Sequence, residues 1–228
     1  DARSFIIILS RTSCRETKSL LMELFIAVLA SIFSVVNPIG ALPVYTSLTE
    51  SYTRKERNKT ALQTSIYFTL ICVVFFLGGS ILLSFFGISI PALRLAGGLV
   101  ILNSGFNLLN GKVIRAESIN DKMKEEAKQK EDISFSPLAM PLLSGPGSIS
   151  LLISLFSQHN SWDKRGIILG VLFTLGVIVY LLLLSAPLIA KLLGEAGMKA
   201  ITRIMGFIVM AIACQYIVSG AMSLIAKY

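Results

Sequence analysis

Acidic residues, histidine and cysteine are scarce in this sequence, and each scarcity argues against a class of function. The 228 residues contain 13 aspartates and glutamates, one histidine and three cysteines. Cys14, Cys72 and Cys214 show none of the spacings that metal sites or disulfide frameworks require, so we interpret them as packing residues. Glu23 and Glu50 lie only at the ends of an apolar run, which argues against a proton relay of buried carboxylates. We expect a protein that is not an enzyme and needs no metal or cofactor.

Charge is also low overall, and apolar residues dominate. Hydrophobic residues make up 54% of the sequence and charged residues 15%, and the mean hydropathy is +0.75. A helix crosses a ~30 Å hydrocarbon core with roughly 20 apolar residues. Six stretches are long enough to do so: Leu24–Leu48, Thr60–Phe86, Ile88–Leu109, Phe135–Ser157, Gly166–Ala190 and Ile201–Ala226. The sequence therefore predicts an all-α integral membrane protein with six transmembrane helices.

The basic residues, which give the chain a net charge of +8, gather in particular connections. Three alternate connections hold most of them: Arg54, Lys55, Arg57 and Lys59, then Lys112, Arg115, Lys122, Lys124, Lys128 and Lys130, then Lys191 and Lys199. The opposite side has Lys164, Arg165 and Lys227, together with four basic residues in positions 1–21. Because cytoplasmic loops carry the excess of lysine and arginine, we expect both termini in the periplasm. The expected partner of this charge is the membrane, not nucleic acid.

Residues 1–21 make a poor signal sequence. Their apolar core, Phe5–Leu9, is only five residues long, and no small-residue cleavage site follows it. A start at Met22 fits the pattern of spans better. We expect residues 1–21 to be a doubtful leader or an upstream extension, and we assign them no function.

The two halves of the remaining chain, 22–110 and 135–228, resemble each other and are joined by a charged segment, 111–134, expected to be a cytoplasmic linker. Three matches have nearly the same offset: Pro38 with Pro146 at 108 residues, Arg94 with Arg203 at 109, and Phe68 with Phe173 at 105. Each half contains three expected spans, so the second half must enter the membrane in the opposite direction. We predict two inverted three-helix repeats, an architecture that many secondary transporters use.

Each half begins with a span that a helix-breaking motif interrupts. Asn is a favoured N-cap and Pro a favoured first helical residue, so Asn37-Pro38 predicts a helix that starts in mid-span. Gly145-Pro146-Gly147 predicts the same in the fourth span. The N–H groups left free would be those of Ile39, Gly40 and Ala41, and of Gly147, Ser148 and Ile149.

Free donors in hydrocarbon are costly, so these N–H groups must face protein, water or a ligand. Two inverted half-helices would direct their positive dipole ends at one midplane point, where a carboxylate can bind. The carbonyl groups before the breaks, in Phe33–Val36 and Met140–Leu143, could face an ammonium group or a coupling cation such as H⁺ or Na⁺. Such a site suits a zwitterion. The alternative is that Pro38 and Pro146 only kink their helices, with nearby glycines allowing close packing.

Other polar residues in the spans have two interpretations. Asn103, Asn107 and Asn110 recur at helical spacing, and such a stripe either joins neighbouring helices or lines a substrate pathway. Arg94 and Arg203 lie near span ends, where snorkelling to headgroups competes with gating or substrate contact.

The motifs "NPIGALPVY" and "PLAMPLLSGPGSIS", with the helix patterns that follow, resemble those of the MarC family, also described as six-span neutral amino acid transporters. The resemblance extends from Met22 to the C-terminus. The family's paired motifs fall on Asn37, Pro38, Gly40, Gly145, Pro146 and Gly147. The resemblance implies a multi-pass protein of the bacterial or archaeal inner membrane, with glycine, alanine or threonine as the substrate class.

We predict a secondary transporter or exporter of small neutral amino acids that works by alternating access. Its expected substrate-binding residues lie at both breaks and on the third span: Asn37, Pro38, Ile39, Gly40, Ala41, Gly145, Pro146, Gly147, Ser148, Asn103 and Asn107. Its expected partners are the amino acid, the lipid bilayer and a coupling cation. Two alternatives stay open. A membrane channel would conduct ions without counterflow, and a structural or assembly protein would not need the mid-span breaks.

Overall fold

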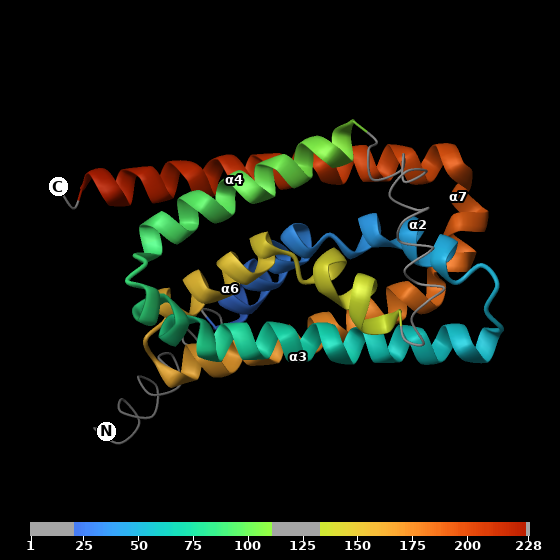
Figure 1. Ribbon diagram of the computed structural model, residues 1–228, viewed down its shortest axis with the longest axis horizontal. Coiled ribbons are helices and arrows are strands. Elements are labelled where there is room, and N and C mark those ends of the chain that lie inside the picture. The colour runs from blue at the N-terminus through green and yellow to red at the C-terminus, as the bar shows by residue number, and fades with distance from the viewer. Residues whose placement is uncertain (1–20, 111–132, 227–228) are drawn as a thin grey trace, which may run out of the picture.

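A computed structural model describes residues 21–110 and 133–226, and within these ranges the chain forms helices and no strands (Figure 1). The helices are Leu21–Val36, α2 (Pro38–Leu48), α3 (Arg54–Phe86), α4 (Ile90–Leu109), η1 (Ser134–Leu143), α6 (Pro146–Gln158) and α7 (Trp162–Ile225). The segment η1 is not a continuous helix, because Ser136 and Met140 have extended backbones. The predicted all-α class is confirmed. Apart from Leu21, the expected leader lies outside the described residues, as does most of the expected linker, 111–134.

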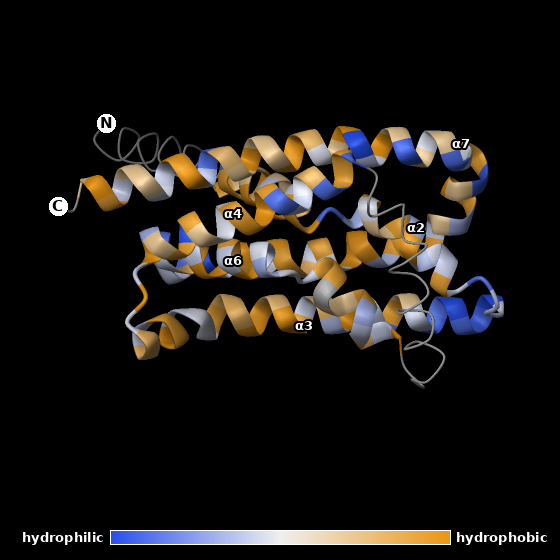
Figure 2. Cartoon of the chain, turned by 45° about the horizontal axis from the view of Figure 1, so that its top comes forward, coloured by the Kyte–Doolittle hydropathy of each residue, from blue (hydrophilic) through white to orange (hydrophobic). Residues whose placement is uncertain are grey.

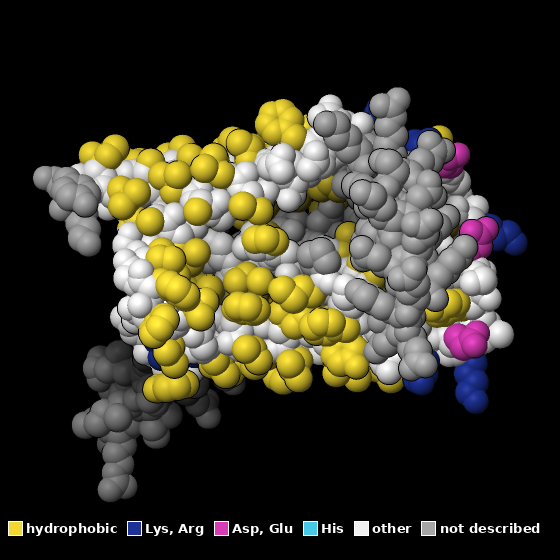
Figure 3. Space-filling model, in the orientation of Figure 1, with side chains coloured by type: hydrophobic (Ala, Val, Ile, Leu, Met, Phe, Trp, Pro, Cys, Tyr) yellow, Lys and Arg dark blue, Asp and Glu magenta, His cyan; other side chains and the backbone are white. Residues whose placement is uncertain are grey.

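Three of these helices, α3, α4 and α7, are long and apolar enough to cross a membrane, and Leu21–Val36 with α2 makes a fourth candidate, bent by 41°. Large apolar side chains are exposed along them, including Phe85 at 82% and Ile81 at 73%. Figure 3 shows hydrophobic side chains spread across the face between the two ends of the molecule. A water-soluble monomer rarely exposes so extended an apolar surface, so the fold is that of an integral membrane protein.

The 64-residue helix α7 turns back on itself partway along. A straight helix of this length would extend about 96 Å at 1.5 Å per residue, roughly three times the hydrocarbon thickness. Gly194 interrupts it with a φ of 61° and a ψ of −177°, a conformation that suits glycine. The chain reverses there (Figure 1). The expected fifth and sixth spans, Gly166–Ala190 and Ile201–Ala226, therefore lie on the two sides of this turn.

The helix α3 begins at Arg54, earlier than the expected span Thr60–Phe86, because a capping box starts it. The Thr53 hydroxyl accepts a hydrogen bond from the Glu56 N–H at 3.3 Å, and the Glu56 carboxylate accepts one from the Thr53 N–H at 2.8 Å. The hydrogen bonds from Thr53 lower the pKa of Glu56, which is exposed. The basic residues of this connection are therefore in the first helical turns of α3, a hydrophilic stretch in Figure 2.

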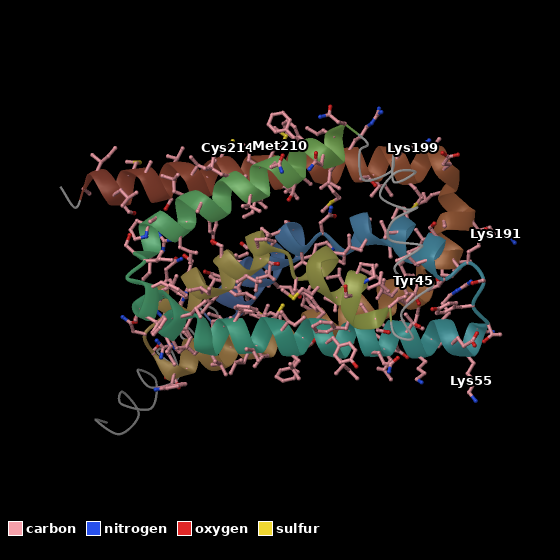
Figure 4. All side chains as sticks on the ribbon, viewed as in Figure 1. Tyr45, Lys55, Lys191, Lys199, Met210 and Cys214 are labelled. Atoms are coloured by element: carbon pink, nitrogen blue, oxygen red, sulfur yellow. The ribbon has the colours of Figure 1, made fainter. Side chains whose placement is uncertain are left out.

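Basic residues from two separate connections lie at the same end of the molecule. Lys55, Lys191 and Lys199 are labelled at this end in Figure 4, and the described chain reaches its C-terminal end at Ala226 on the opposite side. We call the first of these the lysine end. Segment direction alternates along the chain: Leu21–Leu48 runs toward the lysine end, and η1 with α6 runs away from it (Figure 1). The predicted gathering of basic connections on one side is therefore confirmed for the described ones.

The helix α4 packs antiparallel to the part of α7 that follows Gly194. Glycines make this close approach possible, since a Cβ on Gly98 would meet Ile217, and one on Gly105 would meet Met210 and Gly206. This pair forms a layer of its own in Figure 1. Most other buried side chains, from α2, α3, η1 and the first part of α7, form one large apolar cluster beside it.

Candidate functional site

The first break occurs at Asn37, between Leu21–Val36 and α2. Asn37 has a left-handed backbone, with φ 49° and ψ 59°, which asparagine tolerates better than most residues. Its carbonyl and its side-chain Oδ1 both accept from the Gly40 N–H, at 3.0 and 3.2 Å. Pro38 is the first residue of α2. The predicted mid-span helix start, with Asn37 as its N-cap, is therefore confirmed.

The second break separates η1 from α6. Ser144 leaves the helical conformation, Gly145 is extended, and Pro146 is the first residue of α6, so the second predicted helix start is confirmed as well. Gly145, the N-cap residue of α6, has no side chain with which to cap the helix. The Ser148 hydroxyl donates to the Gly145 carbonyl at 2.8 Å and thus braces the break without using an N–H group of the helix.

Some of the six N–H groups predicted to be free are engaged. The Gly40 N–H is held by Asn37, and the Ile149 N–H donates to the Gly145 carbonyl at 3.1 Å. Within residues 21–110 and 133–226, the N–H groups of Ile39, Gly147 and Ser148 have no hydrogen-bond acceptor. Each break therefore presents at least one unpaired backbone donor at the start of a half-helix, where the helix dipole is positive.

Two buried hydroxyl groups that sequence reasoning missed also have no hydrogen-bond partner among the described residues. Ser144, at the second break, is 1% exposed, and Thr64, on α3, is fully buried. The Cys72 thiol lies beside the Ser144 hydroxyl in a geometry that falls short of a hydrogen bond. The sequence did offer a signal for Ser144, because this serine directly precedes the Gly145-Pro146 motif. It offered no signal for Thr64. Buried hydroxyl groups are normally paired, so both are candidates to contact a ligand.

The side chain of Ile101, on α4, connects the surroundings of the two breaks. A Cβ on Gly147 would lie 2.5 Å from Ile101 Cγ1. Val35, two residues before Asn37, packs against the small cluster of Ile101, Leu108, Val209 and Ala213. Both breaks therefore border the same buried cluster near the middle of the molecule (Figure 1). In this conformation Ile101 occupies the space beside Gly147 where we expected a ligand to approach the backbone.

The asparagine stripe of α4, formed by Asn103, Asn107 and Asn110, is less buried than Ile101 on the same helix. Asn103 and Asn110 are exposed and Asn107 is half-buried, and none of the three side chains makes a hydrogen bond within the described part of the chain. At 100° per residue, Asn103 is about 200° around α4 from Ile101. The structure therefore does not bring Asn103 to the breaks, although it does bring Gly147 and Ile101 together.

The two matched arginines have different surroundings. Arg94 Nε donates to the Ser154 hydroxyl on α6 at 2.7 Å, and Gln158 Nε2 donates to the same oxygen at 2.9 Å. Arg203 is exposed and has no hydrogen bond or ion pair with any described residue. Neither arginine faces a carboxylate, because the ion pair found in the described ranges joins Glu195 to Lys199.

A different pair of arginines performs the same task in both halves. Arg57, near the start of α3, donates from Nη2 to the Thr49 carbonyl at the end of α2, at 2.9 Å. Arg165, near the start of α7, donates from Nε to the His159 carbonyl at the end of α6, at 2.8 Å. Each thus satisfies a carbonyl at the C-terminal end of a half-helix, where positive charge is favoured. Arg165 also lies 3.8 Å from the centre of the Phe156 ring.

Comparison with known proteins places the chain in a family. The model of the MarC family of integral membrane proteins matches residues 22–225. The UPF0056 membrane protein MJ1677 of Methanocaldococcus jannaschii is 42% identical over 200 residues, covering 87% of this chain and 96% of that protein. The inner membrane protein MarC of Citrobacter koseri is 34% identical over 220 residues, covering 91% and 100%. The membrane protein YvbG of Bacillus subtilis is 33% identical over 201 residues, covering 88% and 95%.

No solved structure gives a significant match to this chain. The inner-membrane location in the names of relatives agrees with the apolar helices described above, so a multi-pass inner-membrane protein is supported on both grounds. The family model spans both breaks and all the described helices except Leu21, the first residue of the first one. The chain therefore belongs to the MarC family of integral membrane proteins.

Proposed function

We propose that this protein is a secondary transporter that carries small neutral amino acids by alternating access, and that the two helix breaks form its substrate site. The observation that carries the proposal is the pair of half-helices, α2 and α6, that start inside the apolar part of the fold with unpaired N–H groups. Each such group costs several kcal/mol in hydrocarbon. A bound substrate would supply the missing acceptors.

The substrate carboxylate would bind between the two half-helix starts. The free N–H groups of Gly147 and Ser148 point out of the first turn of α6, and that of Ile39 out of the first turn of α2. Both helix ends carry a positive partial charge that favours an anion. The unpartnered Ser144 hydroxyl, directly before α6, adds a donor of the kind that carboxylate sites use.

The ammonium group would be held by backbone carbonyls instead of carboxylates. The described spans contain no aspartate or glutamate close to the breaks, and Glu23 and Glu50 lie at the ends of the first span. The carbonyl groups before the two breaks, in Phe33–Val36 and Met140–Leu143, would face the same region as the half-helix starts, although that of Phe33 already accepts from the Asn37 N–H at 2.9 Å. A coupling Na⁺ would be coordinated by carbonyls of the same kind. The proposed site has no additional charged group that could pair with a charged substrate side chain. The proposed substrates are therefore amino acids with neutral side chains.

The proposed mechanism requires that the six expected spans form two inverted repeats. The two breaks, Asn37-Pro38 and Gly145-Pro146, start equivalent half-helices 108 residues apart. The arginines that hold the ends of these half-helices, Arg57 and Arg165, also lie 108 residues apart. The opposite directions of the two broken spans in Figure 1 agree with an inversion. Rocking of one repeat against the other would expose the site to each side in turn.

Counterflow in proteoliposomes tests the function. Vesicles that contain the purified protein and are loaded with unlabelled alanine should accumulate labelled alanine, glycine or threonine, whereas labelled glutamate should stay outside. Empty vesicles and vesicles loaded with sucrose are the controls. Ion currents without counterflow would indicate a channel. Correctly folded protein that supports neither current nor counterflow with any neutral amino acid would leave a structural or assembly role.

The orientation of the protein is a separate prediction. Lys55, Lys191 and Lys199 share one end of the molecule (Figure 4), so the positive-inside rule puts that end in the cytoplasm. Alkaline phosphatase fused after Tyr228 should be active, since it needs the periplasm, and green fluorescent protein inserted at Lys122 should fluoresce in the cytoplasm. Exchanging the two reporters should abolish both signals. The reverse pattern would overturn the orientation and leave the proposed repeats intact.

A further inference from the structure

The α4 helix is locked to α6 at the end of the molecule opposite the lysine end. Arg94 Nε donates to the Ser154 hydroxyl at 2.7 Å, and the Ser150 hydroxyl donates to the Leu93 carbonyl at 3.0 Å. A Cβ on Gly97 would collide with the Ser150 side chain, so the two helices are as close as glycine permits. These contacts lie near the start of α4, far from Lys55 (Figures 1 and 4).

An inverted repeat predicts a second contact equivalent to that of Arg94 with Ser154. Its residues follow from the offset of 108 or 109 residues that separates the matched positions of the two halves. The counterpart of Arg94 is Arg203 on α7, at an offset of 109, and the counterpart of Ser154 is Thr46 on α2, at an offset of 108. The match is chemically sensible, because Thr46 offers a hydroxyl group where the first pair has a serine. Both counterparts lie toward the lysine end, with Arg203 one helical turn beyond Lys199.

The counterpart contact is not made in this structure. The Thr46 hydroxyl donates to its own helix, with the carbonyls of Leu42 at 3.0 Å and Pro43 at 2.9 Å as acceptors. Arg203 is exposed and bonds to no described residue. The three atoms closest to a Cβ on Gly206, the counterpart of Gly97, all belong to α4 and none to α2. One of two equivalent contacts is thus formed and the other is open.

We propose that Arg94 with Ser154 and Arg203 with Thr46 are two gates that close alternately, and that this structure has the Arg94 gate closed. The proposal rests on the proposed inverted repeats. When the repeats exchange conformations, α4 separates from α6, and the part of α7 after Gly194 approaches α2. Arg203 then donates to the Thr46 hydroxyl oxygen, whose O–H still donates to the carbonyls of Leu42 and Pro43. With the lysine end in the cytoplasm, the closed Arg94 gate is the periplasmic one.

The geometry explains why arginine suits this task. A guanidinium next to a hydroxyl makes a charge-assisted hydrogen bond, which is stronger than a neutral one. No described carboxylate pairs with Arg94, so the closed Arg94 gate is not held by a buried ion pair that would be hard to open. Closing the second gate costs Thr46 no hydrogen bond, because its oxygen can accept from Arg203 while its O–H still donates to Leu42 or Pro43. Two arrangements of similar free energy are what alternation requires.

Cross-linking tests the two gates in the full chain with Cys14, Cys72 and Cys214 replaced by alanine. The pairs are Arg94→Cys with Ser154→Cys and Arg203→Cys with Thr46→Cys, treated with a bifunctional methanethiosulfonate reagent. Each pair should cross-link, each cross-link should stop counterflow, and a reductant should restore it. A control pair, Arg94→Cys with Thr46→Cys, joins residues of different gates and should not cross-link. If the Arg203 and Thr46 positions never cross-link in a variant that still performs counterflow, the second gate does not exist and the transporter proposal stands.

Removal of the hydroxyl groups gives an independent readout. Thr46→Val should slow counterflow about tenfold, the factor expected for loss of one hydrogen bond to a charged group, and should increase cross-linking of the Arg94 gate pair. Thr174→Val is the matched control, since the Thr174 hydroxyl likewise donates to its own helix, at 2.8 Å, and belongs to no gate. Equal rates and equal cross-linking for both variants would overturn the role of Thr46. Absence of counterflow in the parent protein would instead overturn the proposed function.

Discussion

The Asn37→Ala variant is expected to lose transport together with about 2 kcal/mol of stability. Asn37 caps α2 through the Gly40 N–H, and loss of an N-cap side chain costs about 1 kcal/mol. Its φ of 49° lies in the left-handed region, where alanine costs roughly another 1 kcal/mol. Thermal unfolding in detergent measures the stability, and alanine counterflow measures the function. A fall in both would still leave the cause of the transport loss undecided, so two further variants separate the contributions.

Asn37→Gly removes the side chain but fits the left-handed backbone, and glycine is a tolerable N-cap, so its stability should stay within a few tenths of a kcal/mol of the parent. Asn37→Asp keeps an oxygen that can accept from the Gly40 N–H but puts a negative charge where we expect the substrate carboxylate. Both variants should fold, and both should transport at least tenfold more slowly, by loss of the amide in one case and by like-charge repulsion in the other. If Asn37→Asp transports alanine as fast as the parent, the carboxylate does not bind at the first break.

The breaks were predictable from sequence because their cause is local. Asparagine before proline specifies a helix start through one side-chain oxygen and one missing N–H, and both effects act within a few residues of Asn37. The same holds for Gly145 and Pro146. The early start of α3 had a local signal as well, since Thr53 and Glu56 have the spacing of a capping box. A search for apolar runs places the start of this span later, at Thr60, because the first turns of α3 contain basic residues.

Contacts between distant segments had no comparable signal. Arg94 and Ser154 are 60 residues apart, and nothing in the local sequence of either predicts that they meet. The asparagine stripe shows a second reason. In a soluble helix a polar stripe marks the outside, and in a membrane helix it is expected to mark the inside, yet Asn103 and Asn110 are exposed here. Which face of α4 packs inward is decided by Gly97, Gly98 and Gly105, where the absence of a side chain permits close approach.

The second break can be tested in a way that separates packing from ligand binding. The Gly147→Val variant would place a Cβ 2.5 Å from Ile101 Cγ1, and overpacking of this kind costs about 1–3 kcal/mol. We expect it to lose both stability and transport. Loss of transport in this variant alone therefore says little about a substrate site, because the collision with α4 explains it.

Combining Gly147→Val with Ile101→Ala resolves this ambiguity. Alanine at position 101 vacates the space that the valine needs, so the two changes should couple, and the double variant should be more stable than Gly147→Val alone. The valine would still cover the N–H groups of Gly147 and Ser148, so transport should stay at least tenfold below the parent even though folding recovers. Ile101→Ala alone should retain transport and accept larger side chains such as leucine, because it widens the space beside Gly147. If the double variant regains alanine counterflow along with its stability, Gly147 serves helix packing only, and the substrate carboxylate binds away from the start of α6.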